Sequence, residues 1–528
     1  MGEPIAGKFL LEILTKGMYS NPMHVYREYI QNSTDSIDKA IASGVLSFAD
    51  ASIHIRIDEN NKTVIIRDNG YGISAEKVKK VLLSIGDSEK NGVDERGFRG
   101  IGRLAGLAYA EEVQFITSAY GEPIKTIMTC DCIKMQKLLQ KTNQETSDVM
   151  ETFTAISSFS EAQPEDINEH YFEVKLIGVP IDSGLLNEND VWDYLAETAP
   201  VDFNSQQFSQ AQKIRDHFES HGFPITCYKI LRGSRKLPIY KPYSRALSTG
   251  KQARTKNKDY VRDVEFVYAE AADGQPLYIG WLALTDFSGI ISDNRVQGIR
   301  FRKGNILIGN NTTFVKYFPS EGHNANRMFA GEIHALHTNL IPNSQRDDFE
   351  PNAVYSEFQS LLGKWAGAIN KKYRRGMSEA TSALKSLDRL NREQKELEAK
   401  IDSGIITSDE KREQVAEQIK QIEKKREKEE QIVRKARERG IFDVDRKETV
   451  EKVLTQTETA SKKMTELNKK VITADYATKN DLPSFYSRHE RKLYQRIIEV
   501  IDTFFTADPQ IAEKLRGAIK SELSEKKK

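Results

Sequence analysis

The pattern of hydrophobic and polar positions divides the chain into an N-terminal part with mixed helix and strand signals and a C-terminal part that is helical. Residues 9–42 have helical spacing, interrupted at Tyr19-Ser20-Asn21-Pro22. Four β-rich runs follow, at 53–57, 64–67, 113–117 and 172–177. We therefore predict an α+β fold whose first domain, residues 1–182, is an α/β sandwich with its helices on one face of the sheet.

A second set of strand signals, at 266–268, 277–284 and 299–308, predicts another α/β domain over residues 183–370. This segment also contains the three tryptophans, Trp192, Trp281 and Trp365. A basic polar stretch at 251–258 is expected to be an exposed loop.

Alternating spacings of four and three residues predict a helical hairpin with a coiled-coil seam over residues 371–440. The seam positions are Ala383, Leu387, Leu390, Gln394, Leu397 and Ile401, then Val415, Ile419, Ile422, Arg426, Glu429 and Val433. Arg426 and Glu429 weaken the seam, so a solvated pair of charged helices with no partner is the alternative. Residues 441–528 are predicted to form a further helical region, with an amphipathic unit at 488–523.

The charge balance gives no sign of a general attraction to nucleic acid or membrane, because 78 Lys and Arg residues face 77 Asp and Glu residues in a chain of 528. Three cysteines, Cys130, Cys132 and Cys227, are too few for a disulfide scaffold and fit a reducing compartment. No run of about eighteen apolar residues indicates a membrane helix. The first residues do not resemble a signal peptide, so a cytoplasmic protein is expected.

Three polar elements in the first domain suggest a nucleotide site that is not a P-loop, since the sequence has no G-x-x-x-x-G-K-[ST]. In the first element, Glu28, Asn32 and Asp35 are spaced by four and three residues and therefore share one face of a helix. An amide oxygen there suits Mg²⁺, and a glutamate can polarise an attacking water. Taken alone, this pattern also fits an ordinary polar helix face.

The second element, Asp68-Asn69-Gly70-Tyr71-Gly72, directly follows a predicted strand. Its glycines permit a close approach of backbone to ligand, and its aspartate can accept a hydrogen bond from an adenine amino group. The third element, Gly97-Phe98-Arg99-Gly100-Ile101-Gly102, precedes a predicted helix whose first amides could hold phosphate oxygens. Residues 84–96, between these elements, could close over a nucleotide as a lid. Simple turns are the alternative interpretation of both glycine-rich segments.

In this order, the three elements resemble the ATP-binding module of the GHKL superfamily, which includes gyrase, the ninety-kilodalton heat-shock chaperones, histidine kinases and MutL. The opening helices, from Leu10 to Asp35, are most similar to those of the heat-shock chaperones. Glu111 to Thr117 resembles the family strand whose threonine reaches the adenine pocket, and Gly97 to Gly100 also resembles the MutL glycine loop. The likeness covers residues 1 to about 365, strongly to residue 120 and weakly beyond 180.

The resemblance implies a Bergerat-type ATPase domain that binds ATP and Mg²⁺. Glu28 matches the water-activating glutamate, Arg27 lies beside it, and Asn32 matches the magnesium ligand. The other implied nucleotide-binding residues are Asp35, Asp68, Gly70, Gly72, Lys90 in the lid, Gly97, Phe98, Arg99, Gly100, Ile101, Gly102 and Thr117.

The likeness extends to residues 341–349 of the second domain, which resemble the catalytic loop of the chaperones. Asn343 and Arg346 match the asparagine and arginine of that loop. An arginine supplied from another domain can neutralise charge that develops on the γ-phosphate. The alternative is a surface ion pair between Arg346 and Asp347 or Asp348. Arg302 and Lys303 are weaker candidates for the same role.

The sequence also departs from the chaperones. Val81 stands about where they carry an asparagine, and the lid is short. The C-terminal region does not resemble their dimerisation domain, which leaves the folding of client proteins less supported than ATP hydrolysis.

We therefore expect a slow ATPase that works as a conformational clamp on protein clients, as a homodimer. One alternative is a nucleic-acid clamp like MutL or MORC proteins, acting in DNA transactions or phage defence. Another is a non-enzymatic partner module whose ATP site only changes its shape.

Overall fold

The computed structural model describes residues 6–18, 21–86, 100–140, 148–160, 163–250, 257–285, 287, 289–318, 322–402, 406, 409–438, 444–473, 482, 485–505 and 508–524. The chain divides into two compact units, Met1–Ala368 and Ile369–Lys528. In the described part of the chain, no helix is both long enough and apolar enough to cross a bilayer.

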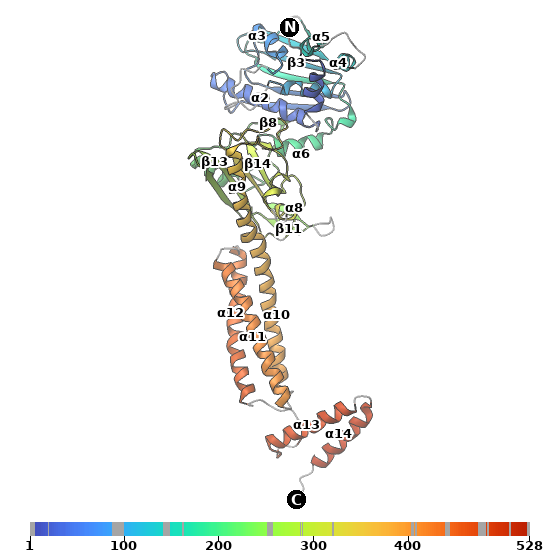
Figure 1. The fold of residues 1–528 in the computed structure, drawn as a ribbon, viewed down its shortest axis with the longest axis vertical. Helices are drawn as coiled ribbons and strands as arrows, with labels where there is room; N and C mark the ends of the chain where they lie inside the picture. Colours follow the sequence, from blue (N-terminus) through green and yellow to red (C-terminus); the bar gives the residue numbers. More distant parts are fainter. Residues whose placement is uncertain are drawn as a thin grey trace. The chain divides into compact units, whose positions relative to one another are not determined.

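The first unit begins with a mixed sheet whose strand order is β5-β4-β3-β7-β2-β1-β8-β9, with β6 paired to β4 (Figure 1). The strands are β1 (Ile53–Asp58), β2 (Thr63–Asp68), β3 (Glu112–Ser118), β4 (Ile124–Asp131), β5 (Ser157–Phe159), β6 (Gln163–Pro164), β7 (Tyr171–Ile177), β8 (Ile230–Arg232) and β9 (Leu237–Pro238). The four predicted strands are present as β1, β2, β3 and β7. Residues alternate along them, so that Val64, Ile66, Val113 and Phe115 face one buried core.

Helices pack on that apolar face, as the sequence predicted. They are α1 (Phe9–Glu12), the π-helical η1 (Ile13–Gly17), α2 (His24–Ala42), α3 (Ala75–Leu83), the 3₁₀ helix η2 (Gly102–Ala108), α4 (Cys132–Leu138) and α5 (Val149–Ile156). The long helix α2 buries Val25, Ile30 and Ile37 in the same core as the strands. Cys130 and Cys132 are free thiols within this core, which agrees with a packing role.

The second sheet has the order β12-β13-β16-β14-β15. Its strands are β12 (Asp263–Glu270), β13 (Pro276–Leu284), β14 (Gly298–Lys303), β15 (Ile306–Ile308) and β16 (Ala330–Ala335), and β10 (Ala246–Thr249) pairs separately with β11 (Asn257–Tyr260). The run predicted as one strand at 299–308 is two strands joined by a tight turn. The accompanying helices are η3 (Ile181–Ser183), α6 (Glu188–Thr198), α7 (Ala211–Ser220), η5 (Thr313–Tyr317), α8 (Gly322–Asn326) and α9 (Ala353–Ile369).

A buried ion network lies in the core of this second sheet. Glu332 on β16 contacts Lys241 Nζ at 2.7 Å and Arg302 Nε at 2.5 Å. His334 Nε2 and the Tyr243 hydroxyl also contact its carboxylate, each at 3.2 Å. Burial disfavours the charged form of Glu332, but the charges of Arg302 and Lys241 overcome this and hold its pKa well below the usual range. Burial lowers the pKa of Lys241 to about 8.

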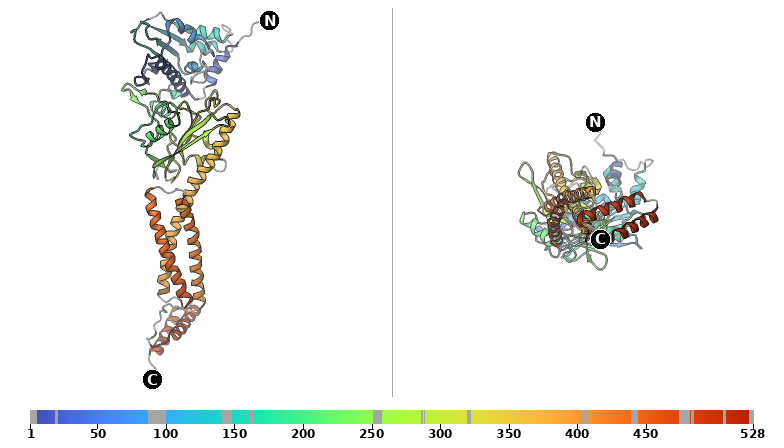
Figure 2. Two further views of the ribbon diagram at one scale, coloured as in Figure 1. Left: turned by 90° about the vertical axis from the view of Figure 1, so that its left-hand side faces the viewer. Right: turned by 90° about the horizontal axis from the view of Figure 1, so that it is seen from below.

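The second unit contains a bundle of three long helices, α10 (Gly376–Asp402), α11 (Asp409–Glu438) and α12 (Val444–Ile472), after a π-helical segment η6 (Asn370–Arg375) (Figure 2). The predicted pairing of the first two helices is confirmed, but α12 packs against both and completes their apolar seam. Val450, Leu454 and Met464 of α12 belong to the apolar clusters that fill this seam.

A polar layer separates two apolar clusters inside this bundle. Arg426, which the sequence marked as a weak seam position, is buried and donates from Nη2 to Gln394 Oε1 at 2.5 Å. Gln394 in turn donates to the carbonyl of Ala460 on α12 at 3.0 Å. One polar residue therefore links all three helices, which favours a single register. Two further helices, α13 (Arg488–Phe504) and α14 (Pro509–Ser524), follow the bundle.

Candidate nucleotide site

Helix α2 carries the first candidate element of the nucleotide site. Glu28 and Asp35 are each less than a tenth exposed, and Asn32 between them is half-buried. The helix repeat places all three on one face, as predicted. Arg27 Nη2 donates to Glu28 Oε1 at 3.3 Å. The candidate base is therefore buried and lies beside a cation.

The phosphate-loop glycines approach the same glutamate. A Cβ atom at Gly102 would lie 2.7 Å from Glu28 Oε2, so any larger residue there would displace the carboxylate. Gly100 has a positive φ of 65°, which favours glycine. The helix expected near Ile101 is the short 3₁₀ helix η2, not an α-helix. Tyr29 of α2 holds it, accepting from Gly106 N at 3.0 Å and donating to Arg103 O at 3.1 Å.

Lys90, Gly97, Phe98 and Arg99, together with most of the predicted lid, lie outside the described residues. Their assignment remains a prediction. Val81 is on α3 with its side chain exposed.

The turn after β2 forms the second candidate element around a buried carboxylate. Asp68 is 1% exposed, and Gly70 N donates to its Oδ1 at 2.9 Å. Burial raises the pKa of Asp68 to about 6, against hydrogen bonds from Ser33, Gly70 and Ser36 that lower it. Near neutral pH this carboxylate is ionised and can accept a hydrogen bond. Its serine neighbours were not singled out in the sequence, where nothing distinguishes them from other polar helix residues.

Gly72 and Thr117 come together at the edge of this turn, as the resemblance implied. Gly72 has a φ of 66°, and a Cβ atom there would overlap the Ser118 carbonyl oxygen. Thr117 Oγ1 accepts from Ile73 N and donates to Tyr171 O, each at 2.9 Å. The hydroxyl therefore fixes the path of the chain just after Gly72.

A loop of the second domain reaches Glu28. Arg346 Nε lies 3.9 Å from Glu28 Oε1, and Arg27 Nη2 donates to the Gln345 carbonyl at 3.3 Å. Arg346 has a positive φ of 56°, a conformation that is strained for a residue with a side chain. Such strain persists only where surrounding contacts enforce it, and this residue is the one whose guanidinium approaches the candidate base.

Asn343, Asp347 and Asp348 of this loop have side-chain partners within the protein. Asn343 Nδ2 donates to Asp347 Oδ1 at 2.6 Å, so its amide holds the loop closed. Asp348 pairs with Lys316 and accepts from the Tyr355 hydroxyl. A nucleotide contact for Asn343 remains a prediction. Arg302 belongs to the buried Glu332 network, and Lys303 donates to the carbonyls of Leu336 and His337.

The protein would supply few of the ligands of a magnesium ion at this site. Among the described residues, no group of three or more His, Cys, Asp or Glu side chains could hold a metal ion. The Asn32 amide, one turn after Glu28, fits the usual arrangement in which Mg²⁺ keeps several waters and binds substrate phosphates.

Comparison with known proteins supports a nucleotide site in the first domain. Residues 19–161 match the family described as "Histidine kinase-, DNA gyrase B-, and HSP90-like ATPase". The resemblance to GHKL ATPases inferred from the sequence is therefore confirmed for this segment.

Individual relatives are similar over nearly the same region. "Chaperone protein HtpG" of Bacillus licheniformis is 33% identical over 130 residues, which are 22% of this chain and 21% of that protein. The protein of the same name from Coxiella burnetii is 37% identical over 115 residues, 21% of this chain and 17% of its own length. That from Streptomyces coelicolor is 27% identical over 138 residues, 22% of each. The chain thus spans about a fifth of the length of the curated relatives it matches.

Proposed function

We propose that the protein is an ATP-hydrolysing conformational clamp in which the second domain completes the active site. The observation that carries this proposal is the approach of Arg346 to Glu28, at 3.9 Å, from a loop more than three hundred residues away in the sequence. A guanidinium in that place can neutralise charge on a γ-phosphate bound beside Glu28. Hydrolysis would then depend on the docking of the two domains, and turnover would be slow.

The chemistry follows from the groups already described. Asp68 would accept from the adenine amino group, with Gly72 and Thr117 beside it, and the phosphates would lie along residues 100–102. Mg²⁺, held by the phosphates and the Asn32 amide, would offset phosphate charge. Glu28 would take a proton from water as the water oxygen bonds to the γ-phosphorus and the bond to the ADP oxygen breaks.

Replacing the second-domain arginine tests whether the domains share the site. We expect Arg346→Ala to lower the rate of ATP hydrolysis by about a hundredfold or more while ATP affinity stays within a few fold, because the guanidinium acts mainly on transition-state charge. Phosphate release and calorimetric binding of ATP would measure the two effects. Arg295→Ala, which removes an exposed arginine of the same domain paired with Asp193 and Asp293, is the matched control. Full activity in Arg346→Ala would contradict the proposed role.

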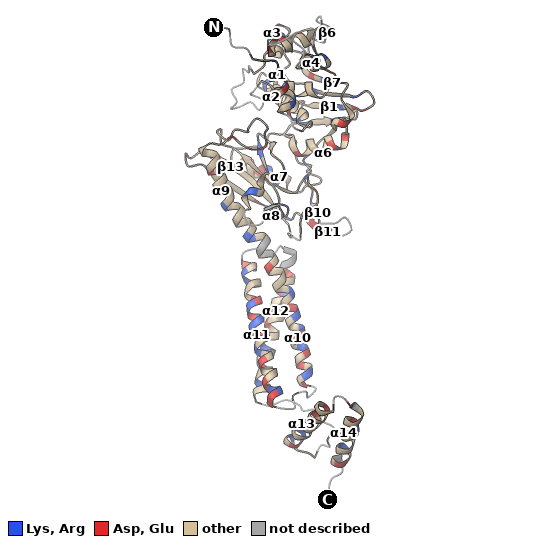
Figure 3. Ribbon diagram, turned by 45° about the vertical axis from the view of Figure 1, so that its right-hand side comes forward, with Lys and Arg blue, Asp and Glu red and all other residues tan. Residues whose placement is uncertain are grey.

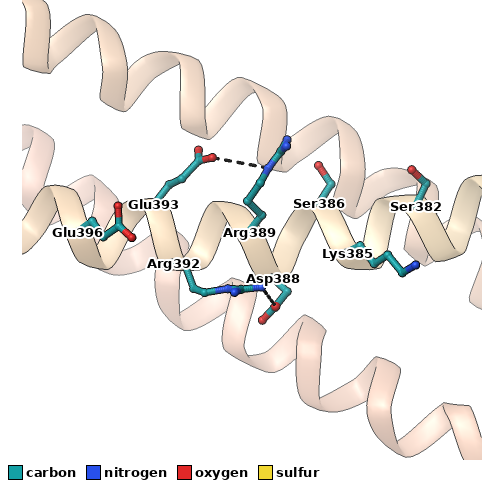
Figure 4. Close-up of a pocket in the computed structure, with 8 residues that line it drawn as sticks. All are labelled: Ser382, Lys385, Ser386, Asp388, Arg389, Arg392, Glu393 and Glu396. Carbon is teal, nitrogen blue, oxygen red and sulfur yellow. Dashed lines mark hydrogen bonds and ion pairs between the residues drawn. The ribbon is translucent and has the colours of Figure 1, made fainter.

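Protein clients are the favoured cargo, because the charges of the helical unit are balanced locally. Acidic and basic residues are interspersed along α10, α11 and α12 (Figure 3). On the outer face of α10, Arg392 pairs with Asp388 and Arg389 with Glu393 (Figure 4). A phosphate backbone would have to displace these carboxylates. DNA binding that weakens steeply with salt would instead support the nucleic-acid clamp.

We also propose that the protein is cytoplasmic and that it forms a homodimer through helix α13. Leu493, Ile497, Val500 and Phe504 form an apolar stripe on this helix, and each is at least 43% exposed. These residues are spaced by four, three and four positions, so the pattern is the same when α13 is followed from either end. An antiparallel copy would therefore place Leu493 opposite Phe504 and Ile497 opposite Val500, as a two-fold interface requires. The acidic residues in the second half of α13, Glu499 and Asp502, already pair within the chain with Lys411 and Arg516, so the proposed interface rests on the apolar stripe.

Mixing two variants tests this arrangement. We expect Ile497→Lys and Val500→Glu each to be monomeric, because each places a charge at the centre of an apolar contact. In a mixture, the introduced lysine of one copy would face the introduced glutamate of the other, and a dimer should re-form in sedimentation velocity. Ile472→Glu, at another exposed apolar residue, is the control. A monomeric wild-type protein, or no recovery on mixing, would contradict the proposed interface.

A further inference from the structure

A glutamine on α2 is buried next to the candidate base. Gln31 is 1% exposed, and among the described residues neither its amide oxygen nor its amide nitrogen has a hydrogen-bond partner. Burying an amide in this way is unfavourable, and a leucine of similar size would avoid the loss. The amide is therefore unexplained by packing alone.

Arg27 lies one helical turn before Gln31, on the same side of α2. Its Nη2 atom donates both to Glu28 Oε1 and to the Gln345 carbonyl, and so connects the candidate base to the second-domain loop. Its Nε atom is buried and, within the described residues, has no hydrogen-bond partner. Nη2 is thus hydrogen-bonded at the site, whereas Nε lies in the protein interior.

Tyr194 of α6 completes this buried group. Helix α6 packs against α2, and the Tyr194 hydroxyl is buried with no hydrogen-bond partner among the described residues. Burial raises its pKa to about 12, and the charges of Arg27, which lowers it, and of Glu28, which raises it, have smaller effects. A phenol hydroxyl and an amide oxygen are suitable acceptors for a guanidinium N–H, directly or through a bridging water. Gln31 on α2 and Tyr194 on α6 therefore each carry a buried, unpartnered group that could accept from Arg27 Nε, directly or through a water.

We propose that Gln31 and Tyr194 are positioning residues of the ATPase reaction: they orient the Arg27 guanidinium so that it joins Glu28 to the second-domain loop. This inference rests on the proposed function. Neither residue is among those assigned to the nucleotide, and both would act through Arg27. Their effect should therefore fall on turnover and not on ATP binding.

The test compares the loss of two tyrosine hydroxyls, that of Tyr194 on α6 and that of Tyr26 on α2. We expect Gln31→Leu and Tyr194→Phe each to lower kcat about tenfold or more with KM for ATP unchanged, because a small displacement of a catalytic group is enough for such a loss. Tyr26→Phe is the matched control, since the Tyr26 hydroxyl is buried too but already has a partner, the Leu185 carbonyl just before α6, at 2.6 Å. Its kcat should match wild type even where its thermal stability falls.

A double-mutant cycle then asks whether the residues act through Arg27. In an Arg27→Ala protein, adding Tyr194→Phe or Gln31→Leu should cause no further loss. If Gln31→Leu does not fold, Tyr194→Phe alone carries the test. Wild-type kcat in folded Tyr194→Phe, or losses that multiply with Arg27→Ala, would overturn the inference while leaving the ATPase intact. A wild-type protein without turnover would contradict both the inference and the proposed function.

Discussion

Glu28→Ala is expected to bind ATP normally and to lose hydrolysis, by about a hundred- to ten-thousandfold, the usual contribution of a general base. The loss follows from the position of the carboxylate, which is buried between Arg27, Gly102 and Arg346. Binding should survive because the adenine contacts lie elsewhere, around Asp68 and Thr117. Steady-state phosphate release and calorimetry with ATP would separate the two effects.

The control for this experiment is Glu76→Ala, which removes an exposed glutamate from the first turn of α3. It should match wild type in both measurements. If wild type binds ATP but turns over no faster than Glu28→Ala, the enzyme proposal is wrong, and the nucleotide acts only as a switch for the helical unit.

Glu332→Ala is expected to destabilise the protein strongly, by about 3–5 kcal/mol in the free energy of unfolding, because removal of one partner leaves buried charges uncompensated. Lys241 and Arg302 both contact this carboxylate, and all three side chains are fully buried. Urea denaturation followed by circular dichroism would measure the change. The Glu332 pKa is lowered in the fold, so its stabilisation is present at neutral pH and is lost as the solution is acidified.

Lys213→Ala provides the comparison, since Lys213 pairs with Asp263 at 2.5 Å where both side chains are about half exposed. An exposed pair contributes roughly 0–1 kcal/mol, so this variant should be close to wild type. If the two substitutions lowered the free energy of unfolding equally, the buried network around Glu332 would contribute no more to stability than an exposed ion pair does.

Regular alternation of apolar residues made the first domain predictable. Helix α2 and strands β1, β2, β3 and β7 were all expected, and the family match over residues 19–161 confirms the GHKL resemblance that rested on the motifs. Strand β16 was missed for a physical reason. Its buried residues include Glu332 and His334, which are stabilised by partners far away in the sequence and so conceal the strand's apolar pattern.

The candidate site was predictable where its residues share a local motif. Spacing alone placed Glu28, Asn32 and Asp35 on one face, and the turn after β2 was marked by its glycines. Gln31 and Tyr194 carried no such signal, because their meaning depends on how α2 packs against α6. The bundle shows the same limit, since nothing local to α10 and α11 indicates that α12 covers their seam.

Strand β8 has a practical consequence for anyone who wishes to prepare the ATP-binding domain alone. It pairs in parallel with β1, where Ile53 N donates to Lys229 O and Gly233 N donates to Ile55 O, each at 2.9 Å. A fragment cut at residue 182 would leave the edge of β1 bare, and open edges recruit strands from other molecules and aggregate. A fragment that continues through β9 to Pro238 keeps this edge covered and should be the more soluble of the two.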